Sequence, residues 1–323
     1  MKNNPLVSII TPCYNGETYV HRLLDSVLSQ TYMNIELIFI NDGSTDRTEE
    51  IALSYEEKFE RRGIEYVYIY QENAGQAAAV NRGLKIFKGD YLTWPDSDDW
   101  MTDDCIEKKV NFLEQHPELG MMMCRTAVVD EDDTSKVVAT LYRRDTHIDG
   151  IFEDLLLERD VYFAPIGYMA RSSDFLDANP SREIYAGNGG QNWQMLLPLA
   201  HRYKCGYLDE ILGFYLTRNS SHSRIDKSYE EKIEKYKRYE CTLINTLYDM
   251  KMDDQERNKY IEKVSQHHDK IRFELAFAYR DIKNLKDAYK KMRRCKRATF
   301  KHKMMYMICR SRVLYWIYKK TKT

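Results

Sequence analysis

Apolar side chains recur with alternating strand and helix periods through the first hundred residues, and this alternation constrains the fold more than any other feature of the chain. Short continuous apolar runs alternate with stretches whose apolar residues lie three or four positions apart, the pattern of βαβ units with a mostly parallel sheet. The expected strands are residues 6–10, 35–40, 64–70 and 91–94, and the expected helices are 19–28, one from about 46, and 76–87. We therefore expect an α/β protein with a Rossmann-like sheet flanked by helices.

The rest of the chain predicts a second half of this domain and then a helical extension. We expect a hairpin around the polar turn 130–133, a helix at 191–203 and a closing strand at 207–216. Beyond residue 225, long stretches rich in Glu, Lys and Tyr have helical character. The expected organisation is one domain at 1–225, with halves at about 1–100 and 101–225, and a helical, basic C-terminal region at 226–323.

The charge distribution and the cysteines indicate the cellular environment of the protein. The formal net charge is −1, yet residues 283–323 carry fifteen Lys and Arg against one acid, Asp287. Such a segment attracts nucleic acid or anionic lipid. The seven cysteines are scattered and never in C-x-x-C spacing, and the first apolar run is shorter than a secretory or membrane segment. We expect reduced thiols and a cytoplasmic protein.

Polar clusters follow three of the expected strands, at residues 11–15, 41–44 and 95–99. The carboxyl ends of parallel strands meet at one edge of a sheet, where ligands of such folds bind. We therefore expect these clusters to converge on one site.

The densest cluster places Asp96, Asp98 and Asp99 within four residues. Their mutual repulsion needs a cation or hydrogen-bond donors, and Mg²⁺ or Mn²⁺ prefers oxygen ligands while keeping positions for diphosphate oxygens. The alternative is a solvated acidic turn that caps a helix beginning near Thr102. Tryptophans on both sides of the cluster favour the metal site.

Two further residues fit a nucleotide crevice. Asp42 lies in an Asn-Asp-Gly segment that is typical of hairpin turns, but here a helix follows, so its carboxylate is free to accept a base N–H. Tyr14 is either a core or rim aromatic, or a stacking surface for a base worth roughly 1–3 kcal/mol.

Taken in order, residues 7–15, 30–32, 38–46, 71–75, 81–83 and 96–99 resemble the motifs of family 2 glycosyltransferases of the GT-A fold. The resemblance extends over about residues 5–225. It implies an inverting, metal-dependent transfer of a sugar from a nucleotide diphosphate, UDP in the first instance, to an acceptor hydroxyl in polysaccharide or glycolipid synthesis. The first half of the domain would bind the nucleotide sugar and the second half a saccharide or lipid-linked acceptor.

The resemblance also implies roles for individual residues. The residues expected around the base are Thr11, Pro12, Tyr14 and Asp42. Asn73 and Arg82 are expected near the diphosphate, and Asp96 and Asp98 near ribose, phosphates and the Mg²⁺ or Mn²⁺ ion. The expected catalytic set is Asp98, Asp99, Gln191 and Asn192, with His222 as a further metal ligand or, alternatively, a hydrogen-bonded loop histidine.

The sequence departs from the family pattern at the catalytic base. Where the family usually carries a Glu-Asp pair, this chain has Gln191 and Asn192, and amides do not accept a proton near neutral pH. A carboxylate from elsewhere, a group on the acceptor, or nucleotide binding without turnover are the open alternatives. The nearby carboxylates are Glu183, Asp209 and Glu210. The Gln-x-x-Arg-Trp signature of processive synthases is missing, which favours transfer of one sugar per encounter.

The basic tail carries two apolar blocks, residues 304–309 and 313–318, each too short to span a bilayer. Bulky apolar side chains beside dense cations suit an anionic membrane surface, so we expect the protein at the inner membrane face; the alternative is a basic helix packed on the rest of the protein. No nucleic-acid-binding signature accompanies the tail, and no such partner is expected. The competing functions are a sugar nucleotidyltransferase and a catalytically silent nucleotide-sugar-binding protein.

Overall fold

The computed structural model describes residues 4–145, 150–187, 189–218 and 228–321. The chain divides into two compact units: residues 1–221 with 248–251, and residues 222–247 with 252–323.

The first unit is built on a nine-stranded sheet with the order β3-β2-β1-β4-β8-β6-β9-β5, and β7 pairs with β6. Its strands are β1 (Val7–Cys13), β2 (Ile35–Asp42), β3 (Glu65–Gln71), β4 (Tyr91–Thr93), β5 (Trp100–Met101), β6 (Leu119–Asp130), β7 (Val137–Leu141), β8 (Tyr168–Arg171) and β9 (Lys204–Thr217). The four strands expected in the first hundred residues are all present. Every residue of β1 and β2 is buried, as expected for parallel strands that are covered on both faces.

The sheet is mixed, which corrects the expectation of a mostly parallel one. β1, β2, β3 and β4 pair in parallel, but β8 is antiparallel to both β4 and β6. The expected hairpin is confirmed as β6 and β7, and the closing strand as β9, which runs parallel to β6. The short β8 has no periodicity long enough to be recognised in the sequence.

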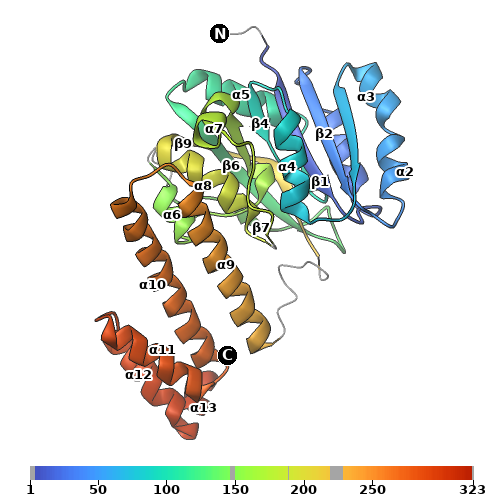
Figure 1. The fold of residues 1–323 in the computed structure, drawn as a ribbon. Coiled ribbons are helices and arrows are strands. Elements are labelled where there is room, and N and C mark those ends of the chain that lie inside the picture. The colour runs from blue at the N-terminus through green and yellow to red at the C-terminus, as the bar shows by residue number, and fades with distance from the viewer. Residues whose placement is uncertain (1–3, 146–149, 188, 219–227, 322–323) are drawn as a thin grey trace. The chain divides into compact units, whose positions relative to one another are not determined.

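The helices of the first unit lie between its strands along the chain. They are α1 (Val20–Leu28), α2 (Thr48–Leu53), α3 (Glu56–Arg62), α4 (Gln76–Ile86), α5 (Cys105–Gln115), α6 (Phe152–Leu156), α7 (Ser172–Ala178) and α8 (Gln191–Arg202), with a 3₁₀ turn at Pro165–Gly167. The single helix expected from residue 46 is two short helices, α2 and α3. Helix α4 packs on β1 and β2 (Figure 1), and Gly83 permits this approach, because a Cβ there would lie 2.5 Å from a methyl group of Ile10.

The second unit is helical: α9 (Tyr229–Asp249), α10 (Asp254–Ala278), α11 (Ile282–Arg294), α12 (Phe300–Arg310) and α13 (Arg312–Lys320). The last three helices lie side by side in the order of the chain (Figure 1). Their core is a cluster around Phe273 and Phe277 of α10, to which Leu285, Met292 and Cys309 contribute. Among the described residues, no helix is both long enough and apolar enough to cross a membrane.

Candidate active site

The loops after β1 and β2 are tied together by side-chain hydrogen bonds. The Asn15 backbone N–H donates to Ser44 Oγ (3.0 Å), and Asn15 Oδ1 accepts from the Thr45 N–H (2.9 Å). The Gly16 N–H donates to Thr48 Oγ1 (2.7 Å), at the start of α2. These bonds hold the first two of the three polar clusters together at the carboxyl edge of the parallel strands.

The predicted base-binding residues differ in how much surface they offer. Thr11 and Pro12 are buried in β1, whereas the ring of Tyr14 is 51% exposed. Between them, Cys13 is buried beside Ser97, and this burial raises the pKa of its thiol to about 12. The end of β1 therefore lies directly against the acidic loop that follows β4.

Asp42 organises the loop before α4. Its Oδ1 accepts hydrogen bonds from Gln71 Nε2 (2.6 Å) and the Ala74 N–H (2.9 Å), and its Oδ2 accepts from the Gly75 N–H (2.9 Å). An ionised carboxylate has about four acceptor sites, so three bonds leave one for a ligand donor. The sequence reasoning predicted the base contact and missed this structural role.

Of the two residues predicted near the diphosphate, one lies just before α4 and the other within it. Asn73 backs onto Gly43, whose φ is 70° and where a Cβ would lie 2.5 Å from the Asn73 backbone nitrogen. Arg82 is exposed on α4 and makes no hydrogen bond or ion pair with any described residue. Its guanidinium is therefore available to an anion.

The acidic loop 96–99 is only partly open to solvent. Asp96 and Asp98 are half-buried and Asp99 is fully buried. Burial and the neighbouring Asp98 raise the pKa of Asp96 to about 7, and the same two causes raise the pKa of Asp99 well above its ordinary value. Asp99 Oδ1 accepts from the Leu216 N–H of β9 (3.0 Å), whereas its Oδ2 is buried without a hydrogen-bond partner among the described residues.

Two residues that sequence reasoning gave no role complete the surroundings of this loop. Arg218 Nη2 lies 2.6 Å from Asp98 Oδ2, and its guanidinium stands over the ring of Tyr19, 4.7 Å from the centroid. Gln76, the first residue of α4, donates from Nε2 to Asp96 Oδ1. Arg218 belongs to the Thr-Arg-Asn-Ser-Ser-His segment that contains His222, and this motif could have identified Arg218 from the sequence.

The fit of these residues to a divalent cation depends on Asp96 and Asp98. Their oxygens are the donor type that Mg²⁺ and Mn²⁺ prefer, and Arg218 is the cation that the structure places against Asp98. Within the described parts of the chain, no group of three or more His, Cys, Asp or Glu side chains could hold a metal ion. An ion held by this pair alone would take its remaining ligands from phosphate and water. The predicted ligand His222 lies outside the described residues.

The two amides at the start of α8 have different surroundings. Asn192 Oδ1 accepts from Trp94 Nε1 (3.3 Å), and its Nδ2 donates to the Phe163 carbonyl oxygen (3.2 Å). Asn192 thus connects the end of β4, two residues before Asp96, to the segment after α6. Gln191 is half-buried and makes no hydrogen bond with a described residue.

Each carboxylate considered as a replacement base is held in an ion pair. Glu183 lies 2.7 Å from Lys85 Nζ, Asp209 lies 2.6 Å from Arg125 Nε, and Glu210 lies 2.7 Å from Lys108 Nζ. All three carboxylates are largely solvent-exposed. Each carboxylate is therefore engaged by a cation, whereas a general base must be free to contact the acceptor hydroxyl.

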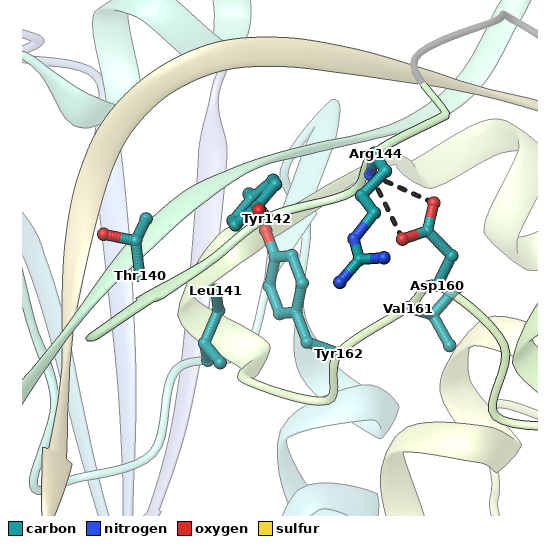
Figure 2. Close-up of a pocket in the computed structure, with 7 residues that line it drawn as sticks. All are labelled: Thr140, Leu141, Tyr142, Arg144, Asp160, Val161 and Tyr162. Atoms are coloured by element: carbon teal, nitrogen blue, oxygen red, sulfur yellow. Dashed lines mark hydrogen bonds between the residues drawn. The ribbon is translucent and has the colours of Figure 1, made fainter.

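A cavity of about 420 Å³ opens in the same unit, after β7 (Figure 2). Its lining includes Tyr142, Arg144, Asp160 and Tyr162. The Asp160 carboxylate accepts from the Arg144 backbone N–H (3.2 and 3.0 Å), and Figure 2 shows the Arg144 guanidinium reaching back between Asp160 and the ring of Tyr162. Tyr162 directly precedes Phe163, whose carbonyl oxygen accepts from Asn192 Nδ2.

The sheet, the tied strand-end loops and the acidic loop together define a protein of the GT-A fold. Comparison with protein families gives the family: the model of glycosyl transferase family 2 matches residues 8–176, a little more than half of the chain, and the chain belongs to this family.

Similar curated proteins and solved structures agree with this family. An uncharacterized glycosyltransferase of Rickettsia typhi is 42% identical over 139 residues, covering 42% of this chain and 42% of that protein. Glycosyltransferase GlyA of Streptococcus pneumoniae serotype 4 is 46% identical over 101 residues, covering 31% of this chain and 14% of that protein. The matches thus span less than half the length of these curated relatives.

Two solved structures show the same fold at low sequence identity. S. aureus TarS 1–349 in complex with UDP-GlcNAc has a TM-score of 0.64 at 17% identity, covering 88% of this chain and 79% of that one. The mannosyltransferase PcManGT of Pyrobaculum calidifontis, in complex with GDP-Man and Mn²⁺, has a TM-score of 0.60 at 14% identity, covering 94% and 79%.

Proposed function

We propose that this protein is an inverting, metal-dependent glycosyltransferase that moves a sugar from a UDP-sugar to an acceptor hydroxyl. The observation that carries the proposal is the meeting of the β1 end with the acidic loop, where Cys13 lies against Ser97 and where Asp98 follows in the same turn. A nucleotide base on the β1 and β2 loops would thereby have its diphosphate near the carboxylates. The TarS complexes with UDP and UDP-GlcNAc and the PcManGT complex with GDP-Man and Mn²⁺ support this donor chemistry.

The chain's own residues would bind the donor in sequence along this edge. The ring of Tyr14 stacks on the base, and the free acceptor site of Asp42 receives a base N–H, within a pocket to which Thr11 and Pro12 contribute backbone. Asn73 and Arg82 meet the diphosphate. Asp96 and Asp98 would hold a Mg²⁺ or Mn²⁺ ion, and such an ion would supply positive charge for the nucleotide diphosphate leaving group.

The acceptor would occupy the cavity shown in Figure 2, which opens after β7. The exposed Tyr142 offers an aromatic face to a saccharide, and the Arg144 guanidinium offers donors to its oxygens. Gln191 faces no described partner and is proposed to orient the acceptor hydroxyl by hydrogen bonding. Neither amide accepts the proton of the acceptor hydroxyl. A group on the acceptor, or a carboxylate brought in by substrate binding, would accept that proton as the sugar is transferred with inversion.

We place this reaction in polysaccharide or glycolipid synthesis at the inner face of the membrane. A lipid-linked acceptor would be presented there, and the basic segment 283–323 is the part of the chain proposed to meet an anionic membrane surface.

The test is release of UDP by the purified protein from a panel of UDP- and GDP-sugars, with Mn²⁺, with Mg²⁺ and with EDTA, and with and without saccharide acceptors. Metal-dependent, acceptor-stimulated release from a UDP-sugar is the expected result. Calorimetric binding of UDP without any turnover would instead identify a silent binding protein. Pyrophosphate formation from UTP and a sugar phosphate would identify a nucleotidyltransferase.

A further inference from the structure

The last two helices, α12 and α13, each turn one face into the core of the second unit. Cys309 and His302 of α12 are buried. In α13 the ring of Tyr315 lies against Phe277, and its hydroxyl donates to the carbonyl oxygens of Phe277 (3.0 Å) and Ala278 (2.7 Å). The Tyr315 hydroxyl is thus hydrogen-bonded to the backbone of α10 and does not need water as a partner.

The opposite face of α13 is apolar and uncovered within the described chain. No residue of α13 is buried, and Val313 and Trp316 are 66% and 57% exposed. The apolar residues share one helical face because they are spaced by one, three or four positions, while the core-facing tyrosines occupy the other side. The exposed set is Val313, Leu314, Trp316 and Ile317.

Helix α12 repeats this arrangement. Phe300, Met304 and Met307 follow one another at spacings of four and three residues, so they form one stripe on the helix. All three are exposed, Phe300 at 76%. Two consecutive helices therefore present apolar stripes away from the Phe273–Phe277 core.

The charge around these stripes has one sign. Residues 300–320 contain six cations and no acid. Lys301, Lys303 and Arg310 flank the α12 stripe; Arg312, Lys319 and Lys320 flank that of α13. Lys320 Nζ lies 4.1 Å from the centre of the Trp316 ring, so apolar and cationic groups are interleaved at the surface.

We propose that the exposed faces of α12 and α13 form a docking surface for an anionic phospholipid bilayer, with both helices lying in the plane of the interface. Bulky apolar groups would enter the acyl boundary while Lys and Arg reach the headgroups. A nucleic acid would leave the apolar stripes exposed, and a second copy of this chain would bring six more cations against these six. The inference rests on the membrane contact proposed above for residues 283–323 and narrows it to two helical faces, and its test does not depend on sugar transfer.

The full-length chain with lipid vesicles tests the proposal. It should co-sediment with vesicles of phosphatidylcholine containing phosphatidylglycerol, at least about ten-fold more tightly than with phosphatidylcholine alone, and the binding should weaken as salt screens the charges. On binding, the fluorescence of exposed Trp316 should shift to the blue and be quenched by brominated acyl chains. Trp316→Phe should remove this signal.

A matched pair of variants distinguishes vesicle binding by the helix surface from non-specific binding by exposed apolar residues. Val313→Ser with Ile317→Ser should lower vesicle affinity at least about ten-fold, since two apolar side chains lose their burial. Val137→Ser with Val138→Ser, which alters two exposed valines of β7, should leave affinity unchanged. Absence of vesicle binding by the wild type, or a Trp316 that brominated acyl chains do not quench, would overturn the proposal. Binding to RNA without binding to anionic vesicles would also overturn it. The quenching measurement on the wild type does not depend on any variant folding.

Discussion

The carboxylate of Asp98 lies 2.6 Å from the guanidinium of Arg218, which itself stands over the ring of Tyr19. The proposed metal ion would need the negative charge of Asp98, and Arg218, which directly follows β9, already neutralises that charge. Any cation bound by Asp98 must compete with or rearrange this pair.

Substitution of Asp98 tests the metal site. Asp98→Asn should leave the fold intact, because Asn fills the same volume, and should remove most metal-dependent turnover, because it deletes a ligand charge. The measurement is UDP release with Mn²⁺ alongside thermal unfolding. Asp103→Asn, an exposed carboxylate after the same loop, is the control and should retain wild-type rates. Near-normal turnover in Asp98→Asn would argue against a metal at this position.

Asp42 should matter for both stability and nucleotide affinity. Asp42→Ala removes the acceptor for the Ala74 and Gly75 N–H groups, so we expect a loss of about 2 kcal/mol in unfolding free energy. The dissociation constant for UDP should rise about ten-fold or more by calorimetry, while Glu50→Gln on the surface of α2 should change neither quantity. Unaltered UDP affinity in the alanine variant would exclude Asp42 from the base pocket.

Restoring the family carboxylate at Asn192 should not restore a base. Asn192→Asp loses the donor to the Phe163 carbonyl oxygen and places a negative charge against it, so we expect lower turnover and about 1–3 kcal/mol less stability. Gln191→Glu leaves both Asn192 hydrogen bonds in place and is the matched stability control. Faster transfer by Asn192→Asp would show that this position does act as the base.

Arg144 should affect the acceptor and spare the donor. Arg144→Ala removes the guanidinium from the cavity but keeps the backbone N–H that Asp160 accepts. We expect a higher KM for a saccharide acceptor with an unchanged dissociation constant for UDP. Arg159→Ala, outside the lining of the cavity, serves as the comparison. Equal KM values in both variants would move the acceptor away from this cavity.

The second unit should lose stability in mild acid through His268. Burial lowers the pKa of this imidazole, with Glu240 and Asp269 opposing and Arg272 assisting the shift. The unfolded chain takes up its proton near pH 6.5 and the folded chain only at a lower pH, so stability falls as the pH drops below about 6.5, by at most about 1.4 kcal/mol per unit. His268→Phe should flatten this slope in denaturant unfolding at pH 5 to 7. The exposed His21→Gln should keep it.

Sequence periodicity predicted the parallel half of the sheet because each of its strands is a continuous apolar run between clear helices. It did not predict β8, whose four residues are too short to show a period, nor the break between α2 and α3. The antiparallel pairing of β8 with β4 and β6 arises from tertiary contacts that no local pattern encodes.

The site shows the same division. The place of the acidic loop was predictable, because the strand-end rule puts it beside the end of β1; the role of Asp96 and Asp98 as metal ligands stays a prediction. The Asp98–Arg218 pair joins residues 120 positions apart, and the Asn192 link to Trp94 and Phe163 requires three separate segments. Such partners follow from the folded geometry and have no spacing in the chain to announce them.

The hydrogen bonds from Asn15 to Ser44 and Thr45, and from Gly16 to Thr48, have a kinetic consequence. They fix the backbone of both loops before any nucleotide arrives, so little conformational entropy remains to be lost on binding. Association with UDP should then proceed in a single fast phase whose rate rises linearly with nucleotide concentration, without a slower isomerisation step from this half of the unit. Discrimination between nucleotides would accordingly lie in how fast each one leaves.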